Sequence, residues 1–197
     1  MSQKILVYTY DRRSSANPFA ELSPEGADAF ESFAVHLMYW LGNSRSVTVK
    51  DLYRTWLSSP EMRQWLSHHV NPSSADLYYG MRWVTHDPLP AIGTTIRRPH
   101  QILQWSTREG IARWFAGIGT TGSKDGWLGG VLMQTKAAGR NIIVDVDAFS
   151  TLCGQHREEF AALVQHSEAR AMFSGDTYEG EVLTTAIRAK VIEASLF

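Results

Sequence analysis

A turn-rich segment, NPSSAD at residues 71–76, divides this sequence into two parts with different hydrophobic patterns. Before it, apolar residues recur at the spacing of amphipathic helices, and after it, short apolar runs between loops are typical of strands. Helices followed by a mostly antiparallel sheet predict an α+β fold. Residues 1–72 are expected to form a helical extension packed on a core of residues 73–197.

Three helices are expected in the first part. Ser23 followed by Pro24 is a helix-start signal, and Gly42 ends the first apolar run. Further helices are expected to begin near Thr48 and at Ser59. Their apolar stripes predict a hydrophobic core rather than a cofactor site.

Two adjacent histidines, His68 and His69, come at the end of the third expected helix. A cation near a helix C-terminus is stabilised by the helix dipole. We therefore interpret them as partners of the dipole, and no metal site is predicted.

The second part is expected to contain strands at 77–84, 127–136, 141–146, 181–187 and 189–194, and helices at 106–116 and 156–166. No internal repeats or low-complexity tracts are present. One compact unit is therefore expected.

The charge balance argues against a nucleic-acid partner. The 197 residues include 19 Lys and Arg and 20 Asp and Glu, for a formal net charge of -1. Because no dense run of basic residues occurs, the electrostatic footprint of a nucleic-acid-binding protein is missing.

The cysteine content and the N-terminus bear on the compartment. Cys153 is the only cysteine, which excludes an internal disulfide and is typical of a reducing environment. The opening MSQKILVYTYDRR has too few apolar residues for a signal peptide or a membrane span. The sequence predicts a cytoplasmic protein, of the producing or the infected cell, without membrane contact.

Two carboxylates stand two residues apart in GDTYEGEVLTT, residues 175–185. At a strand entrance, period-two geometry directs Glu179 and Glu181 to the same side, where like charges repel. Acidic residues in such a place most often form a solvated face. The alternative is a site that uses both carboxylates.

Two further stretches are candidates for chemistry. LYYGMRW, residues 77–83, is an aromatic strand interrupted by Gly80, which indicates either a strand bulge or a close approach of a ligand. QWSTREGIARWFA, residues 104–116, contains Ser106 and Glu109 at the spacing of a capping box, which predicts a helix start.

Three stretches, taken in chain order, resemble the signature of mono-ADP-ribosyltransferases of the Arg-Ser-Glu class, which is found in toxins and phage enzymes. They are LYYG, WST with Ala112 and Phe115, and EGEVL. The resemblance covers residues 77–187, just over half of the chain. It implies a split, two-sheet, mostly antiparallel β core, and NAD as a substrate. It implies no metal.

The resemblance gives the two carboxylates separate roles. Glu181 would stabilise the positive charge that develops on the ribose as nicotinamide leaves NAD, and would bond the ribose 2'-hydroxyl. Glu179 would face the acceptor, orient its guanidinium and take its proton.

The resemblance also implies residues that contact NAD. Ser106 would brace Glu181, and Thr107 would line the pocket. Gly80 would offer its backbone N–H and C=O to the nicotinamide amide. Lys124, in the glycine-rich GIGTTGSKDGW of residues 117–127, would reach a phosphate, although that segment is equally typical of a flexible connection.

The sequence departs from the family pattern at two positions. Tyr79 occupies the place of the usual arginine, and it stacks and hydrogen-bonds but carries no positive charge. Arg82, three residues further on, is a substitute cation for NAD. Arg108 replaces the third residue of the Ser-Thr-Ser element.

These observations predict an NAD-dependent mono-ADP-ribosyltransferase that modifies arginine on a target protein, of a host, and releases nicotinamide. An NAD glycohydrolase and an inactive interaction protein on the same fold remain alternatives. A glycosidase is disfavoured, because its two carboxylates flank the scissile bond from opposite sides.

Overall fold

The structure is a computed structural model that describes residues 17–42, 49–84, 87–97, 102–119, 128–174, 180–185 and 187–196. Its helices are η1 Pro18–Glu21, α1 Pro24–Leu41, α2 Val49–Ser58, α3 Pro60–His69, α4 Glu109–Ala116, η2 Gly139–Asn141, α5 Val146–Gln155, α6 Arg157–Leu163 and α7 Ser167–Met172. Its strands are β1 Ser74–Trp83, β2 Thr95–Arg97, β3 Ile102–Ser106, β4 Gly129–Ala138, β5 Ile142–Asp145, β6 Glu181–Thr185 and β7 Arg188–Leu196.

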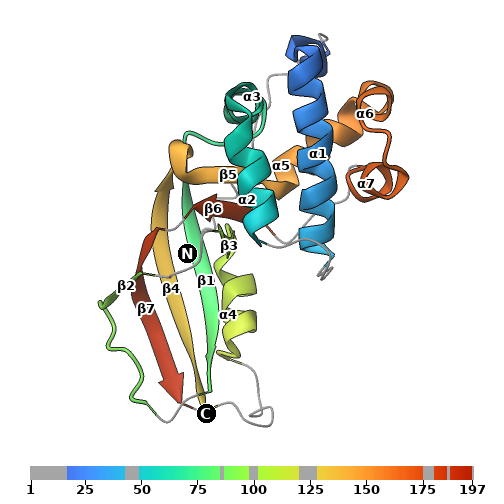
Figure 1. The fold of residues 1–197 in the computed structure, drawn as a ribbon. Helices are drawn as coiled ribbons and strands as arrows, with labels where there is room; N and C mark the ends of the chain where they lie inside the picture. The colour runs from blue at the N-terminus through green and yellow to red at the C-terminus, as the bar shows by residue number, and fades with distance from the viewer. Residues whose placement is uncertain are drawn as a thin grey trace.

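The seven strands form one sheet in the order β2-β7-β4-β1-β3-β6-β5, and every neighbouring pair is antiparallel. The predicted α+β class with a mostly antiparallel sheet is therefore confirmed. In Figure 1, α4 runs alongside β1, and the other α-helices gather at one end of the long strands β1, β4 and β7.

The sheet narrows to a single residue pair at its middle. β1 and β4 pair along ten residues, from Ser74 to Trp83, and β3 and β6 pair along five. Between them, β1 and β3 are in register only at Tyr78 and Ser106. The sheet therefore consists of a four-stranded group, β2-β7-β4-β1, joined at one point to a three-stranded group, β3-β6-β5.

The predicted helix starts at Ser23 and Ser59 are confirmed, since each serine accepts a hydrogen bond from the backbone of its helix's first turn. Glu61, in the first turn of α3, also accepts hydrogen bonds of 2.7 Å from the backbone N–H and the hydroxyl of Ser23. These bonds favour the ionised carboxylate and lower the pKa of Glu61. They tie the start of α1 to the start of α3.

A first hydrophobic core joins the N-terminal helices to α5–α7. Phe30 is fully buried, with its ring 5.0 Å from Trp65 and 5.6 Å from Phe149. Phe19 stacks on Trp65 at 5.3 Å. Such aromatic pairs add about 0.5–1.5 kcal/mol each beyond the burial of their surface.

A second hydrophobic core draws on both groups of strands. Leu77 and Met133 come from the four-stranded group, and Trp105 and Val182 from the three-stranded group. Since all four are buried, the two groups pack against each other through this core. This core holds β1, β3 and β6 close together where β1 pairs with β3 and β3 pairs with β6.

Several predicted boundaries are wrong. The helix expected at 106–116 begins only at Glu109, and the strand expected at 141–146 ends at Asp145, where α5 begins. The strands β2 and β3 and the helices α5 and α7 were not predicted. Within the described residues, no helix combines the length and the apolar character needed to cross a membrane.

Candidate active site

Three polar side chains form a row across β1, β3 and β6. Tyr78 is the register partner of Ser106, and Ser106 is the register partner of Glu181. Directly opposed residues of antiparallel strands point to the same face of the sheet, with Cβ atoms about 4.5–5.5 Å apart. We refer to Tyr78, Ser106 and Glu181 as the site row.

A cavity of about 190 Å³ opens beside the site row. Its lining includes the whole row together with Tyr79 and Gly80, and it is completed by Gln104, Trp105 and the α4 residues Ile111, Ala112 and Phe115. Four of the residues expected to contact NAD or to act on it, namely Tyr79, Gly80, Ser106 and Glu181, are thus brought together.

A second cavity, of about 240 Å³, is lined by residues of α6 and α7, among them Arg157, Phe160 and Arg170. Among the described residues that line it, none carries a carboxylate and none belongs to the site row. The smaller cavity is therefore the better candidate for catalysis, because it combines a concave surface with a carboxylate and a hydroxyl.

The two tyrosines before Gly80 point to opposite faces of β1. The ring of Tyr79 packs against Trp105 at 5.6 Å and lies on the second hydrophobic core. Tyr78 shares the face of the site row, and its hydroxyl accepts a hydrogen bond of 3.3 Å from Gln134. Strict alternation along the strand places Tyr78 on the same face as Gly80, although the motif in the sequence points to Tyr79.

Gly80 is required by the packing of α4. A Cβ atom at this position would lie 1.7 Å from the carbonyl oxygen of Ala112 and 2.8 Å from the backbone nitrogen of Ala116. A side chain would therefore displace the helix that forms one wall of the cavity. This close approach explains the glycine without a ligand, so the expected contact of Gly80 with nicotinamide stays a prediction.

Arg82 lies outside the cavity lining. Its side chain is exposed, and its Nε donates a hydrogen bond of 3.2 Å to the carbonyl oxygen of Phe115, in the last turn of α4. In this position its charge complements the helix dipole. No basic side chain occurs among the described residues that line the cavity.

Ser106 ends β3 and does not cap α4. The N-cap residue of α4 is Arg108, without a side-chain capping bond, so the capping box predicted from Ser106 and Glu109 is wrong. Instead, the buried Ser106 hydroxyl accepts a hydrogen bond of 3.0 Å from the backbone N–H of Arg108. This local turn fixes the serine at the mouth of the cavity.

The entrance of β6 is held by contacts around Gly180, which has a φ of 70° in the left-handed region. Its carbonyl oxygen accepts a hydrogen bond of 2.8 Å from the backbone of Thr107. Its N–H donates to the carboxylate of Asp147 at 3.1 Å, and Arg108 lies 3.8 Å from the same carboxylate. Together these contacts position the strand that begins with Glu181.

The remaining expected residues differ in their placement. Thr107 belongs to this strand entrance and does not line the cavity. Glu179, which precedes Gly180, and Lys124 both lie outside the described residues. Their expected roles stay predictions.

A buried carboxyl group, that of Asp145, lies on β5, the strand next to the one that carries Glu181. Asp145 is the register partner of Val182, the residue after Glu181, and its side chain caps α5 by accepting a hydrogen bond from Ala148. Burial raises the pKa of Asp145 to about 6, and the charge of Asp147 acts in the same direction. In the sequence, Asp145 directly follows the apolar run IIV of residues 142–144. An aspartate in this place is typical of a helix N-cap, and this pattern could have identified the residue.

Comparison of the chain with known protein families, with curated proteins and with solved structures gives no match. The candidate site therefore rests on its own geometry.

Proposed function

We propose that this chain is an NAD-dependent mono-ADP-ribosyltransferase that modifies arginine on a target protein. The observation that carries the proposal is the cross-strand pairing of Ser106 with Glu181 at the mouth of a cavity bordered by Tyr79 and Gly80. The three stretches that resemble the transferase signature thus meet in one place, although they are far apart in the sequence.

The chemistry requires a carboxylate beside the ribose. As the bond between ribose C1' and the nicotinamide nitrogen breaks, positive charge develops on the sugar, and nicotinamide leaves as a neutral base. Glu181, held at the first position of β6 beside Ser106, would stabilise that charge electrostatically. The guanidinium of the acceptor then forms a bond to C1' and gives up one proton, to Glu179 in this proposal.

The cavity suits one end of a dinucleotide. Small-molecule sites usually enclose about 300–1,000 Å³, and this one encloses about 190 Å³. Its aromatic side chains Tyr78 and Phe115 favour a flat ring such as nicotinamide, and the remainder of NAD would extend outside it. The resemblance implies a core of two sheets, whereas these strands form one sheet that narrows to a single residue pair between β1 and β3.

One observation favours the alternatives. Because no described residue of the cavity lining is basic, a cation for the pyrophosphate of NAD would have to come from outside this lining. Weaker NAD binding, hydrolysis of NAD by water, or an inactive interaction protein would each be compatible with such a lining. The experiment must therefore separate transfer, hydrolysis and lack of activity.

The direct test is incubation with adenine-labelled NAD and a host-cell lysate, followed by gel electrophoresis and chromatography of free label. Transfer leaves label on a protein, whereas hydrolysis leaves it as free ADP-ribose. Replacing Glu181 by Gln should lower the rate about 100- to 1,000-fold with an unchanged melting temperature. The matched control is Asp76→Asn, an exposed carboxylate on the same strand as Tyr78. Full activity of Glu181→Gln, or no reaction of NAD at all, would overturn the proposal.

A further inference from the structure

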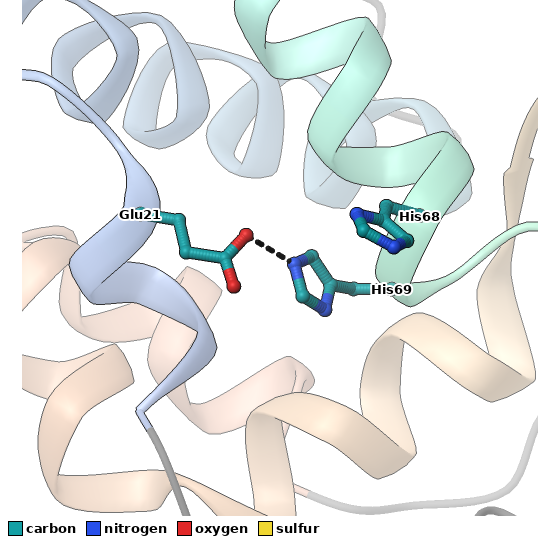
Figure 2. Close-up of side chains that lie close together, drawn as sticks. All are labelled: Glu21, His68 and His69. Carbon is teal, nitrogen blue, oxygen red and sulfur yellow. Dashed lines mark hydrogen bonds and ion pairs between the residues drawn. The ribbon is translucent and has the colours of Figure 1, made fainter. Parts of the chain in front are cut away.

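A cluster of three metal-ligand residues lies on the N-terminal helices, away from the cavity lining. Glu21 ends η1, and His68 and His69 end α3 (Figure 2). One ligand atom from each side chain lies within 4.8 Å of the other two. We propose that Glu21, His68 and His69 form a binding site for one Zn²⁺ ion, with a water molecule as the fourth ligand.

The backbone on both sides of the cluster is held in place by the first hydrophobic core. The indole N–H of Trp65 donates a hydrogen bond of 2.8 Å to the carbonyl oxygen of Pro18, and Phe19 stacks on the Trp65 ring. These contacts fix η1 against α3. The ligands therefore come from two elements whose relative position is already set without an ion, which reduces the entropy lost on binding.

His69 is the anchoring ligand. Its side chain is only 14% exposed, and its ring lies 5.1 Å from that of Trp65. Its Nε2 atom is 2.8 Å from a carboxylate oxygen of Glu21. Figure 2 shows this contact, with the ring of His68 beside that of His69. Two imidazoles and one carboxylate, each bound to the metal, are a common set of protein ligands for zinc, with water in the fourth position.

The geometry requires only rotations of exposed side chains. Zinc bonds to nitrogen and oxygen measure about 2.0–2.2 Å, so tetrahedral ligand atoms lie about 3.4 Å apart. The contact of Glu21 with His69 would lengthen slightly, and His68 would turn inward. Both Glu21 and His68 are exposed, so neither movement disturbs the core.

The donor atoms select the class of metal. Two imidazole nitrogens and one carboxylate favour zinc and its neighbours, whereas Mg²⁺ and Ca²⁺ prefer sites made of oxygen alone. In the sequence, the helix dipole is a sufficient explanation for the two histidines. Glu21 is not recognisable there as a third ligand, because it is 48 residues away from His69. The third ligand becomes visible only in the folded chain.

The test is calorimetric titration of the full chain with ZnCl₂, with MgCl₂ as the comparison ion. We expect one zinc ion per chain and no binding of magnesium. Loss of an outer-shell partner alone typically weakens metal binding about 10- to 100-fold, so His68→Gln, His69→Gln and Glu21→Gln should each weaken it at least about tenfold. The matched control is His156→Gln, which removes a histidine that lies 4.0 Å from one carboxylate, that of Glu159. This variant should bind zinc as tightly as the unaltered chain.

A second readout protects the test against variants that fail to fold. Zinc should raise the melting temperature of the unaltered chain and of His156→Gln, because an ion that binds only the folded state stabilises it. It should raise that of Glu21→Gln and His68→Gln much less, and these two exposed positions leave the core intact. The proposal would be overturned if the unaltered chain did not bind zinc, or if Glu21→Gln and His68→Gln bound zinc as tightly as the unaltered chain. Either result would count against the zinc site whatever the outcome for NAD.

Discussion

The two flanks of β3 are built differently. On its β6 flank, β3 pairs along five consecutive residues, the last of which joins Ser106 to Glu181. On its β1 flank, a single pair joins Ser106 to Tyr78. A continuous ladder fixes the serine relative to the glutamate, whereas the cavity opens where the ladder stops.

The fold thus combines a rigid flank with an accessible one. On the β6 flank, backbone hydrogen bonds set the distance between the two polar side chains. On the β1 flank, α4 replaces further pairing, and Gly80 and Gly130 let its backbone approach β1 and β4 closely. The position of the cavity wall therefore depends on the packing of a helix on glycines. Substitutions on either flank can test the two arrangements separately.

The largest effect is expected at Gly80, on the β1 flank. In Gly80→Ala, the new methyl group would lie 1.7 Å from the carbonyl oxygen of Ala112, and backbone cannot turn away as a side chain does. The free energy of unfolding should fall by about 3 kcal/mol, the upper end for overpacking, as measured by urea denaturation. The control is Gly110→Ala, on α4 itself, where a Cβ atom meets nothing within 4 Å. Equal stability of the two variants would show that α4 does not depend on this glycine.

A pH-dependent effect is expected on the β6 flank, at Asp145. Its folded pKa of about 6 exceeds the ordinary pKa of an aspartate, 3.8. The folded chain therefore binds more protons than the unfolded chain between about pH 4 and pH 6. The stabilising contribution of the neutral carboxyl is complete below about pH 4 and is lost as the pH rises through about 6. Over that window the free energy of unfolding falls by up to about 3 kcal/mol.

Asp145→Asn should remove this loss, because the amide is neutral at every pH and also caps helices well. Denaturation at pH 7.5 should show the variant as more stable than the unaltered chain, and at pH 4 the two should be nearly equal. Asp28→Asn, at an exposed position of α1, is the control and should show no such crossover. A variant that is less stable at pH 7.5 would mean that the ionised carboxylate is well compensated.

A smaller effect is expected at Asp147, which holds the entrance of β6. In Asp147→Ala, the N–H of Gly180 loses its 3.1 Å acceptor, which should lower the free energy of unfolding by about 1 kcal/mol. Hydrogen exchange at the start of β6 should become faster. If the proposed activity is present, kcat should fall more than the KM for NAD changes, because Glu181 would lose its support. Asp51→Ala, which removes a 4.0 Å pair with Arg54 on α2, is the control, and equal exchange in both would contradict this role.

The sequence was sufficient where local chemistry decides the structure. Ser23 and Ser59 mark their helix starts correctly because capping and proline preferences act within one turn. It was insufficient at Ser106, where the same capping signal was present but the residue pairs with Tyr78 and Glu181 in the sheet. Register between strands is decided by long-range packing, which no window of sequence contains.

The candidate site shows the same division. The resemblance selected Ser106 and Glu181, and the fold places them as neighbours. Tyr79 was chosen over Tyr78 because it occupies the motif position directly before Gly80. Which face of the sheet a side chain occupies is instead decided by alternation along the strand. Gly80 was correctly singled out, but the close approach that it permits is that of Ala112 in α4, which no local pattern reveals.

The smallest effect on stability is expected at Tyr78, and it separates the two flanks most sharply. Tyr78→Phe removes a long hydrogen bond of 3.3 Å from Gln134 and keeps the ring, so the free energy of unfolding should change by about 0.5 kcal/mol. Because Tyr78 lines the cavity and its hydroxyl bonds to Gln134, in the proposed function the variant should raise the KM for NAD several-fold with kcat unchanged, the pattern of lost ground-state binding. Tyr53→Phe, on α2 beside Trp56, is the control and should alter neither constant. A fall in kcat with an unchanged KM would instead place Tyr78 with the reacting groups, and the β1 flank would then share the chemistry that we assign to the β6 flank.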